Sequence, residues 1–414
     1  MEKRTLRVGF VGSGFIAQFH AQAMLQVRDV ELSGIVESRG ARRLSGWAQD
    51  QGLGPATLYK TVSELAKNVD IVAIYSPNHT RLDVMDELAL ARRSGAGVTG
   101  VICDKPLGRN MREAKAMVQA AKDAGLKTAY FENQIHMKAV QSQRAQLAPQ
   151  IRQMGPLSLV RSAEEHGGPH QAWFWDPTRQ GGGVLSDMGC HSIAVAWYML
   201  TPPTEKLTFL VPQSVTCDVG LLKWGRKSAR EALLEKFGVD YSKTPAEDFA
   251  TGTITFKNPD TNQLVKAQFT DSWMFEKQGL RIFMDGMGPG YAFEINTLNS
   301  PLTLFVGDEA GGAVANSDVA LEKATASRGL MNVHYNEADL YGYVDENLNA
   351  FQQFRRGQDG LLSFSYGLEV TRLVMAAYLS AERRKTIDLT PDMLRELDTY
   401  TPLIQQGKGA EVLL

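Results

Sequence analysis

Cysteine is scarce in this chain: Cys103, Cys190 and Cys217 are the only three among 414 residues. Their spacing fits neither a disulfide framework nor a zinc site, so we expect a reducing, cytoplasmic setting. Charge of one sign is also scarce, because the formal net charge is −2, which gives no reason to expect nucleic acid as a partner. The N-terminal residues contain no long apolar run, so we expect neither a signal peptide nor a membrane partner.

The composition is that of a globular protein, with 43% hydrophobic and 22% charged residues. A chain of 414 residues is too long for one ordinary hydrophobic core. We therefore expect two domains.

The N-terminal segment carries a glycine-rich turn between a predicted strand and a predicted helix. Residues 6–11 form a short apolar run, and "GSGFIA" follows at residues 12–17. Gly12 allows a tight turn, Gly14 lets the backbone approach a pyrophosphate, and Ala17 lets the helix lie close to the sheet. This pattern predicts a dinucleotide site.

Residues after the second predicted strand bear on the choice of cofactor. Glu37 follows that strand, twenty residues after Ala17. A carboxylate here accepts hydrogen bonds from ribose hydroxyls and repels a 2′-phosphate, which favours NAD. The residues directly behind it can instead hold a 2′-phosphate, so NADP stays open: Ser38, Arg39, Arg42 and Arg43.

Three further strand-like runs follow, at residues 69–77, 99–106 and 126–132, each preceded by a helical segment. Such alternation predicts a parallel, doubly wound sheet. Lys105 follows one of these strands, and residues after a parallel strand lie over the cofactor crevice. We place the dinucleotide-binding Rossmann domain at residues 1–135 and a second α/β domain at 136–414.

The segment "GGGVLSDMGCHSIAVAWYML" at residues 181–200 predicts an apolar helix with two polar groups in its first turns. Asp187 and His191 are four residues apart and so share a face. His191 suits a general base, since an unperturbed imidazole has a pKa of about 6.5. Asp187 can orient it or the substrate, Lys105 can donate to the reacting oxygen, and the glycines let the chain pass close to a ligand. The alternative is a pair of helix-capping side chains.

Histidines and aromatic residues gather just upstream, in "EEHGGPHQAWFW" at residues 164–175. Aromatic faces pack against the apolar faces of sugar rings, although such a cluster can also fill a core. We predict a substrate-binding role for His166, His170, Trp173 and Trp175, together with Lys105, Asp187 and His191. The same imidazoles and Asp187 are plausible metal ligands, but we expect no metal.

Four of these motifs, in this order, resemble the Gfo/Idh/MocA oxidoreductases, which include glucose–fructose oxidoreductase and inositol dehydrogenases. They are "GFVGSGFIAQFH", "SPNH", "CDKPLG" and "GGGVLSDMGCH". The resemblance implies a Rossmann domain followed by an α/β domain with a large, mostly antiparallel sheet. It implies hydride transfer between NAD(P) and a hydroxyl of a sugar, polyol or cyclitol, with no metal.

The resemblance also assigns residues. The family lysine matches Lys105, although Asp104 replaces the usual glutamate, and the family aspartate and histidine match Asp187 and His191. Arg81 stands where the family often has a histidine, and "ENQIHM" at residues 132–137 replaces an asparagine–arginine pattern. The predicted cofactor-binding residues are Gly12, Gly14, Phe15, Ile16, Glu37, Ser38, Pro77, Asn78, His79 and Lys105.

The second half alternates polar and apolar residues in several segments, as strands with one covered face do. We expect the other face to join copies of the chain into a dimer or tetramer. Residues 223–250 look polar and helical without an assignable role, and residues 307–317 look like a flexible loop. Two closing helices are predicted at residues 337–356 and 366–384.

The resemblance to this family leaves three functions open. The first is an NAD-dependent dehydrogenase that acts on a sugar, glycoside or cyclitol. The second uses the same parts in a glycosidase that oxidises C3 transiently, eliminates the aglycone and re-reduces the sugar. The third is a non-catalytic dinucleotide sensor, which the presence of Lys105, Asp187 and His191 disfavours.

Overall fold

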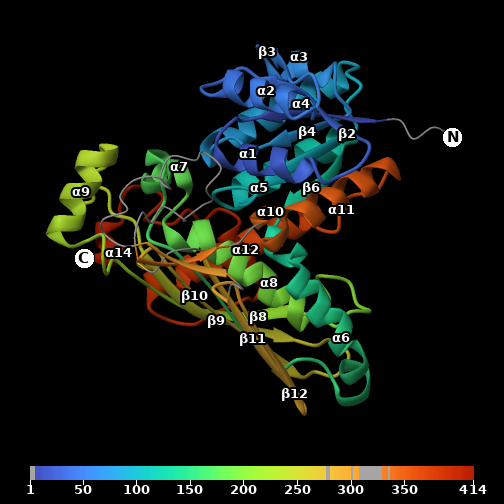
Figure 1. Cartoon of the computed structure of the whole chain (residues 1–414). Helices are drawn as coiled ribbons and strands as arrows, with labels where there is room; N and C mark the ends of the chain where they lie inside the picture. The colour runs from blue at the N-terminus through green and yellow to red at the C-terminus, as the bar shows by residue number, and fades with distance from the viewer. Residues whose placement is uncertain (1–4, 277–279, 300–301, 307–328, 334–335) are drawn as a thin grey trace. The chain divides into compact units, whose positions relative to one another are not determined.

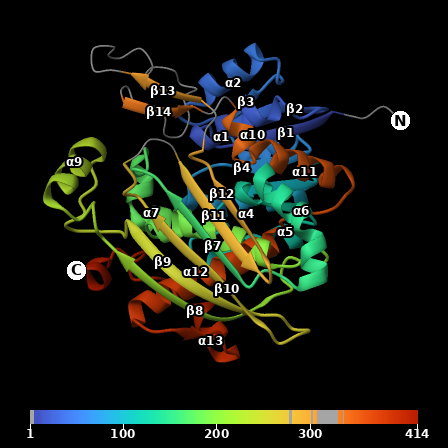
Figure 2. The same cartoon turned by 60° about the horizontal axis from the view of Figure 1, so that its bottom comes forward.

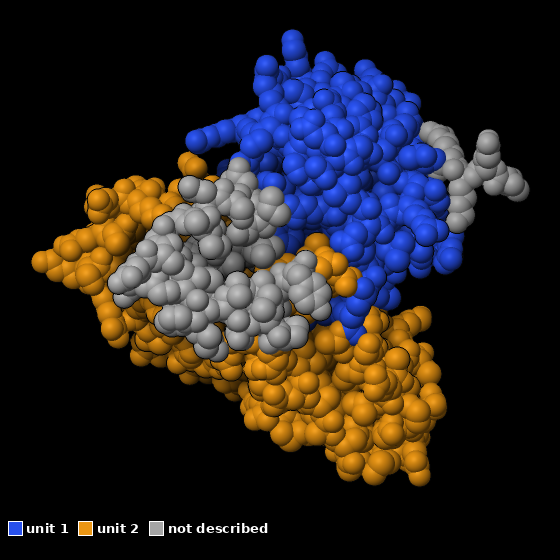
Figure 3. All heavy atoms as spheres, in the orientation of Figure 1, with its two compact units in different colours: residues 1–138, 341–372 blue, residues 139–340, 373–414 orange. Residues whose placement is uncertain are grey.

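The computed structural model describes residues 5–276, 280–299, 302–306, 329–333 and 336–414, with 302–306 and 329–333 described by their backbone alone. The chain forms two compact units (Figure 3). The first unit comprises residues 1–138 and 341–372, and the second comprises residues 139–340 and 373–414. The predicted boundary assigned all residues after 135 to the second domain, whereas residues 341–372 return to the first unit.

The first unit contains a six-stranded sheet in the order β3-β2-β1-β4-β5-β6. All neighbouring strands are parallel, which confirms the predicted doubly wound sheet. Only three residues form β3, too few for an apolar pattern, and the sequence did not predict it. The strands are β1 Leu6–Val11, β2 Val30–Val36, β3 Thr57–Tyr59, β4 Ile71–Ile74, β5 Gly100–Asp104 and β6 Lys127–Phe131.

Helices cover this sheet, and one of them comes from late in the chain (Figure 1). Helix α11 packs against α1, and its Phe351 and Phe354 join the core that contains Val8 and Phe10. The return of residues 341–372 therefore completes the first hydrophobic core. The helices are α1 Phe15–Met24, α2 Ala41–Asp50, α3 Val62–Ala66, α4 Arg81–Arg93, α5 Met111–Asp123 and α11 Tyr343–Arg355, with 3₁₀ turns η1 Asn78–Thr80 and η2 Asn133–His136.

A glycine divides the first predicted closing helix into two. Helix α10 (Glu337–Leu340) ends before Gly342, which has a φ of +87° and caps the start of α11. An added Cβ on Gly342 would lie 2.2 Å from the carbonyl oxygen of Asn133. The predicted single helix over residues 337–356 is therefore wrong at this point, because only glycine fits the turn.

The second unit contains a seven-stranded sheet in the order β12-β11-β7-β10-β9-β8-β15 (Figure 2). Only β7 and β10 pair in parallel, so the predicted large, mostly antiparallel sheet is confirmed. Strands β13 (Leu302–Val306) and β14 (Gly329–Val333) form a separate two-stranded antiparallel sheet. The sheet strands are β7 Leu159–Glu165, β8 Val211–Gly220, β9 Phe249–Lys257, β10 Leu264–Ser272, β11 Arg281–Gly288, β12 Tyr291–Asn296 and β15 Ile387–Asp388.

Helix α8 (Cys190–Leu200) packs against β7 and β10, and all of its residues are buried. Of the unassigned residues 223–250, only α9 is helical, and the predicted loop at 307–317 lies outside the described residues. The other helical segments are α6 Lys138–Met154, α7 Pro177–Gln180, α9 Lys227–Phe237, α12 Phe364–Arg383, α13 Pro391–Leu397 and α14 Ala410–Leu413, with the 3₁₀ turn η3 Ala172–Trp175 and the π-turn η4 Leu185–Gly189.

All three cysteines are buried, and none of these three forms a disulfide. The predicted cytoplasmic setting stays a prediction. Within the described ranges, no helix is both long and apolar enough to cross a membrane.

Candidate active site

The loop after β1 has the shape that a dinucleotide requires. Gly12 has a φ of +111°, and an added Cβ would lie 2.6 Å from the carbonyl carbon of Tyr75, in the loop after β4. Gly14 begins α1, is exposed, and leaves open space where a Cβ would stand. The N-cap residue of α1 is Gly14, which has no side chain to cap the first N–H groups, so the positive end of α1 suits a pyrophosphate. Phe15 and Ile16 form this first turn and are partly buried.

Glu37 stands at the carboxyl end of β2 and is exposed. Because β2 pairs in parallel with β1, Glu37 lies at the same edge of the sheet as Gly12. Arg42 Nη2 lies 3.4 Å from Glu37 Oε1, with side chains 85% and 45% exposed. A pair this exposed contributes at most about 1 kcal/mol, so a ligand can displace the arginine. Ser38 Oγ lies 2.9 Å from Ser13 Oγ and braces the loop.

The loops after β4 and β5 carry the remaining predicted cofactor residues. Pro77 precedes the turn η1, where Asn78 is buried and His79 is partly buried. Lys105 directly follows β5, is partly buried, and is joined to Pro106 by a cis peptide bond. Since β1, β2, β4 and β5 are parallel, the structure brings all of these loops to one edge of the sheet.

Arg81 links the loop after β4 to the loop after β5, which carries Lys105. Its side chain is buried, and Nε donates to the carbonyl of Ser76 at 3.0 Å. Nη1 donates to the carbonyls of Asp104 and Pro106, each at 2.5 Å. Nη2 lies 3.7 Å from Asp104 Oδ2. Because these carbonyls flank Lys105, Arg81 fixes the backbone that carries the lysine.

In the second unit, Asp187 and His191 lie where the π-turn η4 meets α8. Turns of this kind often occur at functional sites. Trp273 Nε1 donates to Asp187 Oδ2 at 3.3 Å. His191 Nε2 lies 3.9 Å from Glu164 Oε2, and both side chains are buried. The structure thus places Glu164, near the end of β7, beside the imidazole.

Asp271 on β10 holds this pair in place. Its Oδ1 accepts hydrogen bonds from Ser192 Oγ at 2.7 Å and from the Glu164 N–H at 3.1 Å. Burial raises the pKa of Asp271 well above its usual range. Asp271 thus links β7 to α8 through these two hydrogen bonds.

The N-terminus of the helix that carries Asp187 and His191 is capped by other residues. The N–H groups of residues 183–186 have acceptors on Glu247 and Tyr378. The N–H of Gly183 donates to Glu247 Oε1 at 2.9 Å, and the N–H of Val184 donates to the Glu247 carbonyl at 3.0 Å. The N–H of Leu185 donates to Glu247 Oε1 at 3.1 Å, and the N–H of Ser186 donates to the Tyr378 hydroxyl at 3.2 Å. The first N–H groups of a helix need such partners, and here neither Asp187 nor His191 has to supply one.

The glycines before this helix pack against the protein itself. Gly182 has a φ of +148°, and an added Cβ would lie 1.9 Å from the Tyr378 hydroxyl. On Gly183 it would lie 2.2 Å from the Glu247 carbonyl oxygen. We predicted that the glycines give room to a cofactor or substrate. The structure corrects this, because they give room to Glu247 and Tyr378.

In the cluster at residues 164–175, some residues remain candidates for the substrate site and others belong to the hydrophobic core. His166 is buried just after β7, where its Nδ1 accepts from the Gly168 N–H at 2.9 Å. His170 is exposed, and Trp173 is partly exposed and stacks on Phe174 with ring centroids 3.8 Å apart. These three residues remain candidates for substrate contact.

Trp175 does not fit its predicted role. It is 1% exposed, and its ring centroid lies 4.6 Å from that of Trp224 and 5.1 Å from that of Trp273. Its Nε1 donates to the carbonyl of Pro169. Protein atoms already cover both faces of the ring, so Trp175 belongs to the core and we leave it out of the substrate site.

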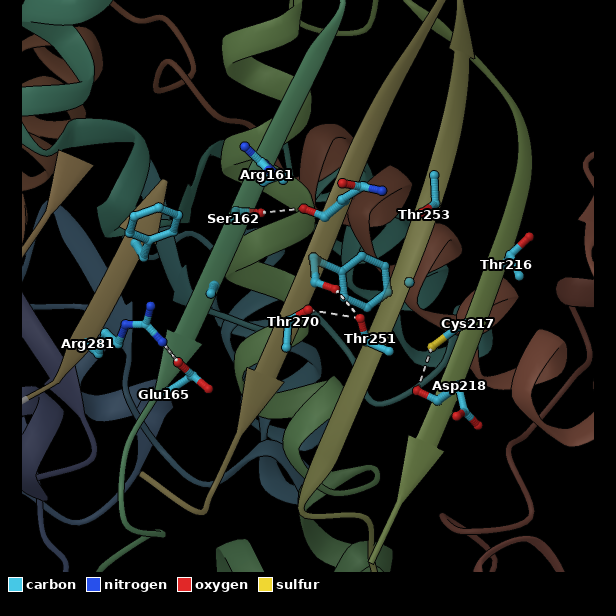
Figure 4. A pocket seen from close by; sticks show the side chains of 15 residues that line it. Arg161, Ser162, Glu165, Thr216, Cys217, Asp218, Thr251, Thr253, Thr270 and Arg281 are labelled. Atoms are coloured by element: carbon cyan, nitrogen blue, oxygen red, sulfur yellow. Dashed lines mark hydrogen bonds and ion pairs between the residues drawn. The ribbon is translucent and has the colours of Figure 1, made fainter. Parts of the chain in front are cut away.

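A second polar region lies on the other face of the seven-stranded sheet (Figure 4). Side chains alternate along β7, so Glu164 faces α8 while Glu165 lines a hollow of about 570 Å³. Glu165 forms an ion pair there with Arg281, and Arg161 Nε lies 2.8 Å from Asp285 Oδ1. This hollow contains none of the predicted catalytic residues.

Sequence reasoning named Arg81, at a position where the resembled family often has a histidine, and Glu164, in the cluster at residues 164–175, but gave them no contact in the site. It missed Glu247, Trp273 and Tyr378, which had no local signal because they reach the helix from 62 to 195 residues away along the chain. No group of three or more potential ligands among the described residues is placed to hold a metal ion.

Known protein families match most of the chain. Residues 6–131 match the family described as "Oxidoreductase family, NAD-binding Rossmann fold". Residues 143–287 match the "GFO/IDH/MocA C-terminal domain". The two matches follow each other in the order found in that family.

Individual relatives agree with this match. D-glucoside 3-dehydrogenase of Escherichia coli (strain K12) is 27% identical over 209 residues, which cover 50% of this chain and 57% of that protein. Myo-inositol 2-dehydrogenase of Thermotoga maritima is 25% identical over 210 residues, which cover 49% of this chain and 57% of that protein. The matched region thus spans less than two thirds of these relatives.

A solved structure extends the likeness of fold to nearly the whole chain. The crystal structure of GenD2 from gentamicin A biosynthesis, in complex with NAD, has a TM-score of 0.73. It is 20% identical and covers 94% of this chain and 97% of that chain. At this identity the likeness is one of fold.

Proposed function

Because the chain belongs to the Gfo/Idh/MocA family of NAD-binding oxidoreductases, we propose that it transfers a hydride between NAD and a hydroxyl of a sugar, glycoside or cyclitol. The names of the relatives support this substrate class, since they denote dehydrogenases of a glucoside and of an inositol. The loops at the carboxyl edge of the first sheet fit the cofactor, because Gly12 makes the tight turn after β1 and Gly14 leaves the first turn of α1 accessible.

One observation carries the catalytic assignment. The N–H groups of residues 183–186 are satisfied by Glu247 and Tyr378, so Asp187 and His191 are not there to cap their helix. Two ionisable side chains buried on an apolar helix need another reason to be present. A catalytic role supplies that reason.

The residues then have distinct roles. His191 takes the proton of the substrate hydroxyl, and Glu164, within ion-pair distance, stabilises the positive charge that forms on the ring. Asp187, oriented by Trp273, holds a neighbouring hydroxyl. Lys105 donates to the reacting oxygen, and Arg81 keeps its backbone in place. When bound, the nicotinamide accepts the hydride.

Cofactor choice and substrate contacts complete the proposal. Glu37 favours NAD over NADP by repelling a 2′-phosphate, although Ser38 and Arg42 are close enough to the same loop to modify that preference. His166, His170 and Trp173 contribute to substrate binding. His166 is the best placed of the three, because it directly follows the strand that carries Glu164.

Copies of the chain associate, in this proposal, through the face of the second sheet that carries the 570 Å³ hollow. Arg161, Glu165 and Arg281 lie on that face and are suited to ion pairs across an interface. Sedimentation velocity tests this: reversing the charge of Arg161 to Glu is expected to lower the sedimented mass, and an unchanged mass would exclude the face.

The function itself is tested with a panel of sugars, glycosides and cyclitols. Purified protein and NAD are followed for NADH absorbance and for product identity. Net NADH together with an oxidised sugar is the expected result. Free aglycone without net NADH would indicate the glycosidase, and NAD binding without turnover on any member of the panel would indicate a sensor.

A further inference from the structure

A pair of residues outside the predicted site holds the start of the helix that carries Asp187 and His191. As described above, Glu247 and Tyr378 accept hydrogen bonds from all four N–H groups of residues 183–186. The two side chains also bond each other, since the Tyr378 hydroxyl donates to Glu247 Oε1 at 2.6 Å. Glu247 directly precedes β9 and Tyr378 lies on α12, so two distant segments meet at this one helix end.

The surroundings of the pair leave it little freedom. Both side chains are fully buried, with 0% of Glu247 and 0% of Tyr378 exposed. The glycines at 182 and 183 are required for this contact, because a Cβ on either would collide with it. A cap in which each N–H group of residues 183–186 has an acceptor specifies one position for the turn that follows.

The turn after this cap carries Asp187, one of the predicted catalytic residues. The first hydrogen bond within the helix runs from the Asp187 N–H to the carbonyl of Gly183 at 3.1 Å. The π-turn Leu185–Gly189 then sets the direction in which Asp187 and His191 point. Any displacement of residues 183–186 is therefore passed on to both side chains.

We propose that Glu247 and Tyr378 form a clamp that positions Asp187 and His191 for catalysis. Neither residue of the clamp touches the reacting atoms, so both are positioning residues. The inference rests on the proposed function for the effect on turnover, but the clamp itself can be observed without turnover. A misplacement of a reacting group by about 1 Å can cost roughly 100-fold in rate, which sets the scale of the expected effect.

The test compares two tyrosine variants. Tyr378→Phe removes the hydroxyl that accepts a hydrogen bond from the Ser186 N–H and donates one to Glu247. Tyr241→Phe is the matched control, because Tyr241 is equally buried in the same unit and its hydroxyl has no hydrogen-bond partner among the described residues. Amide hydrogen exchange is measured on peptides that cover residues 182–189, with residues 193–200 as the internal reference.

In Tyr378→Phe we expect exchange in residues 182–189 to be about tenfold faster, as the loss of one hydrogen bond implies. We expect kcat to fall roughly 10- to 100-fold while KM for NAD stays within twofold. Tyr241→Phe is expected to match the wild type in both measurements. Unchanged exchange in Tyr378→Phe would overturn the clamp, and faster exchange with unchanged kcat would overturn its positioning role.

A second pair of variants covers the case in which Tyr378→Phe does not fold. Glu247→Gln keeps an acceptor oxygen for Gly183 and Leu185, whereas Glu247→Leu removes it at similar size. Exchange at these amides is expected to be faster in the leucine variant than in the glutamine variant, and equal exchange would overturn the clamp. Should the wild type turn over no substrate of the panel, the proposed function fails, and these exchange comparisons still decide whether the clamp exists.

Discussion

The Glu247→Gln variant is expected to change how the stability of the protein depends on pH. Burial raises the pKa of Glu247 from 4.5 to about 7. The groups around this carboxyl are Tyr378 on α12, Tyr241 before β9 and Cys217 on β8, and ionisation of any of them would only add negative charge. A raised pKa means that the folded protein retains a proton that the unfolded chain has lost. Stability is therefore lost as the pH rises from about 4.5 through 7.

The size of the effect follows from the shift. Each unit of pKa corresponds to about 1.4 kcal/mol, so between pH 5 and pH 8 the wild type is expected to lose about 2 to 3 kcal/mol through Glu247. A glutamine cannot ionise and removes this loss. All other titrating groups are shared, so they cancel when the two proteins are compared.

Urea unfolding followed by tryptophan fluorescence suits the measurement, because Trp47 is the only one of the six tryptophans outside the second unit. The free energy of unfolding is measured for both proteins at pH 5 and pH 8. We expect the difference between wild type and variant to change by about 2 to 3 kcal/mol in favour of the variant at pH 8. The same pH dependence in both proteins would refute the assignment of a buried, protonated Glu247.

Three further changes test other parts of the account. Glu37→Ala should narrow the preference for NAD over NADP in kcat/KM, and a wild type that prefers NADP would contradict the role of Glu37. Lys105→Met should lower kcat on the order of 10²–10³-fold with the NAD dissociation constant unchanged, and near-normal turnover would exclude the lysine as donor. Arg81→Met should lower the unfolding free energy by about 3–5 kcal/mol, because it removes the hydrogen bonds to three carbonyls and the buried ion pair with Asp104. A loss below about 1 kcal/mol would show that these bonds contribute little.

Local patterns in the sequence were sufficient for much of the fold. The strand–glycine–helix pattern around Gly12 predicted the nucleotide site, and the alternation of strands with helices predicted the parallel sheet, because both depend on neighbouring residues. Alternating residues in the second half predicted strands with one covered face, and the family resemblance predicted that they form a mostly antiparallel sheet. The three-residue strand β3 and the break at Gly342 escaped prediction, since neither produces a pattern long enough to recognise.

The site was less accessible to sequence reasoning, because its contacts join distant segments. Asp187 and His191 were found from their spacing, yet Glu164 reaches His191 from β7 and the cap of the helix comes from Glu247 and Tyr378. Trp175 shows the opposite error. Its neighbourhood in sequence suggested a sugar platform, but packing against aromatic residues up to a hundred positions away makes it part of the core.

The pH–rate profile of His191→Asn tests the central claim most directly. For alcohol oxidation by the wild type, kcat/KM should rise with pH through one ionisation, as an imidazolium loses its proton. In His191→Asn, with the best substrate of the panel, we expect that ionisation to disappear together with most of the rate, while NAD affinity stays near that of the wild type. A variant that keeps both the rate and the ionisation would contradict the account and would assign proton transfer to another group.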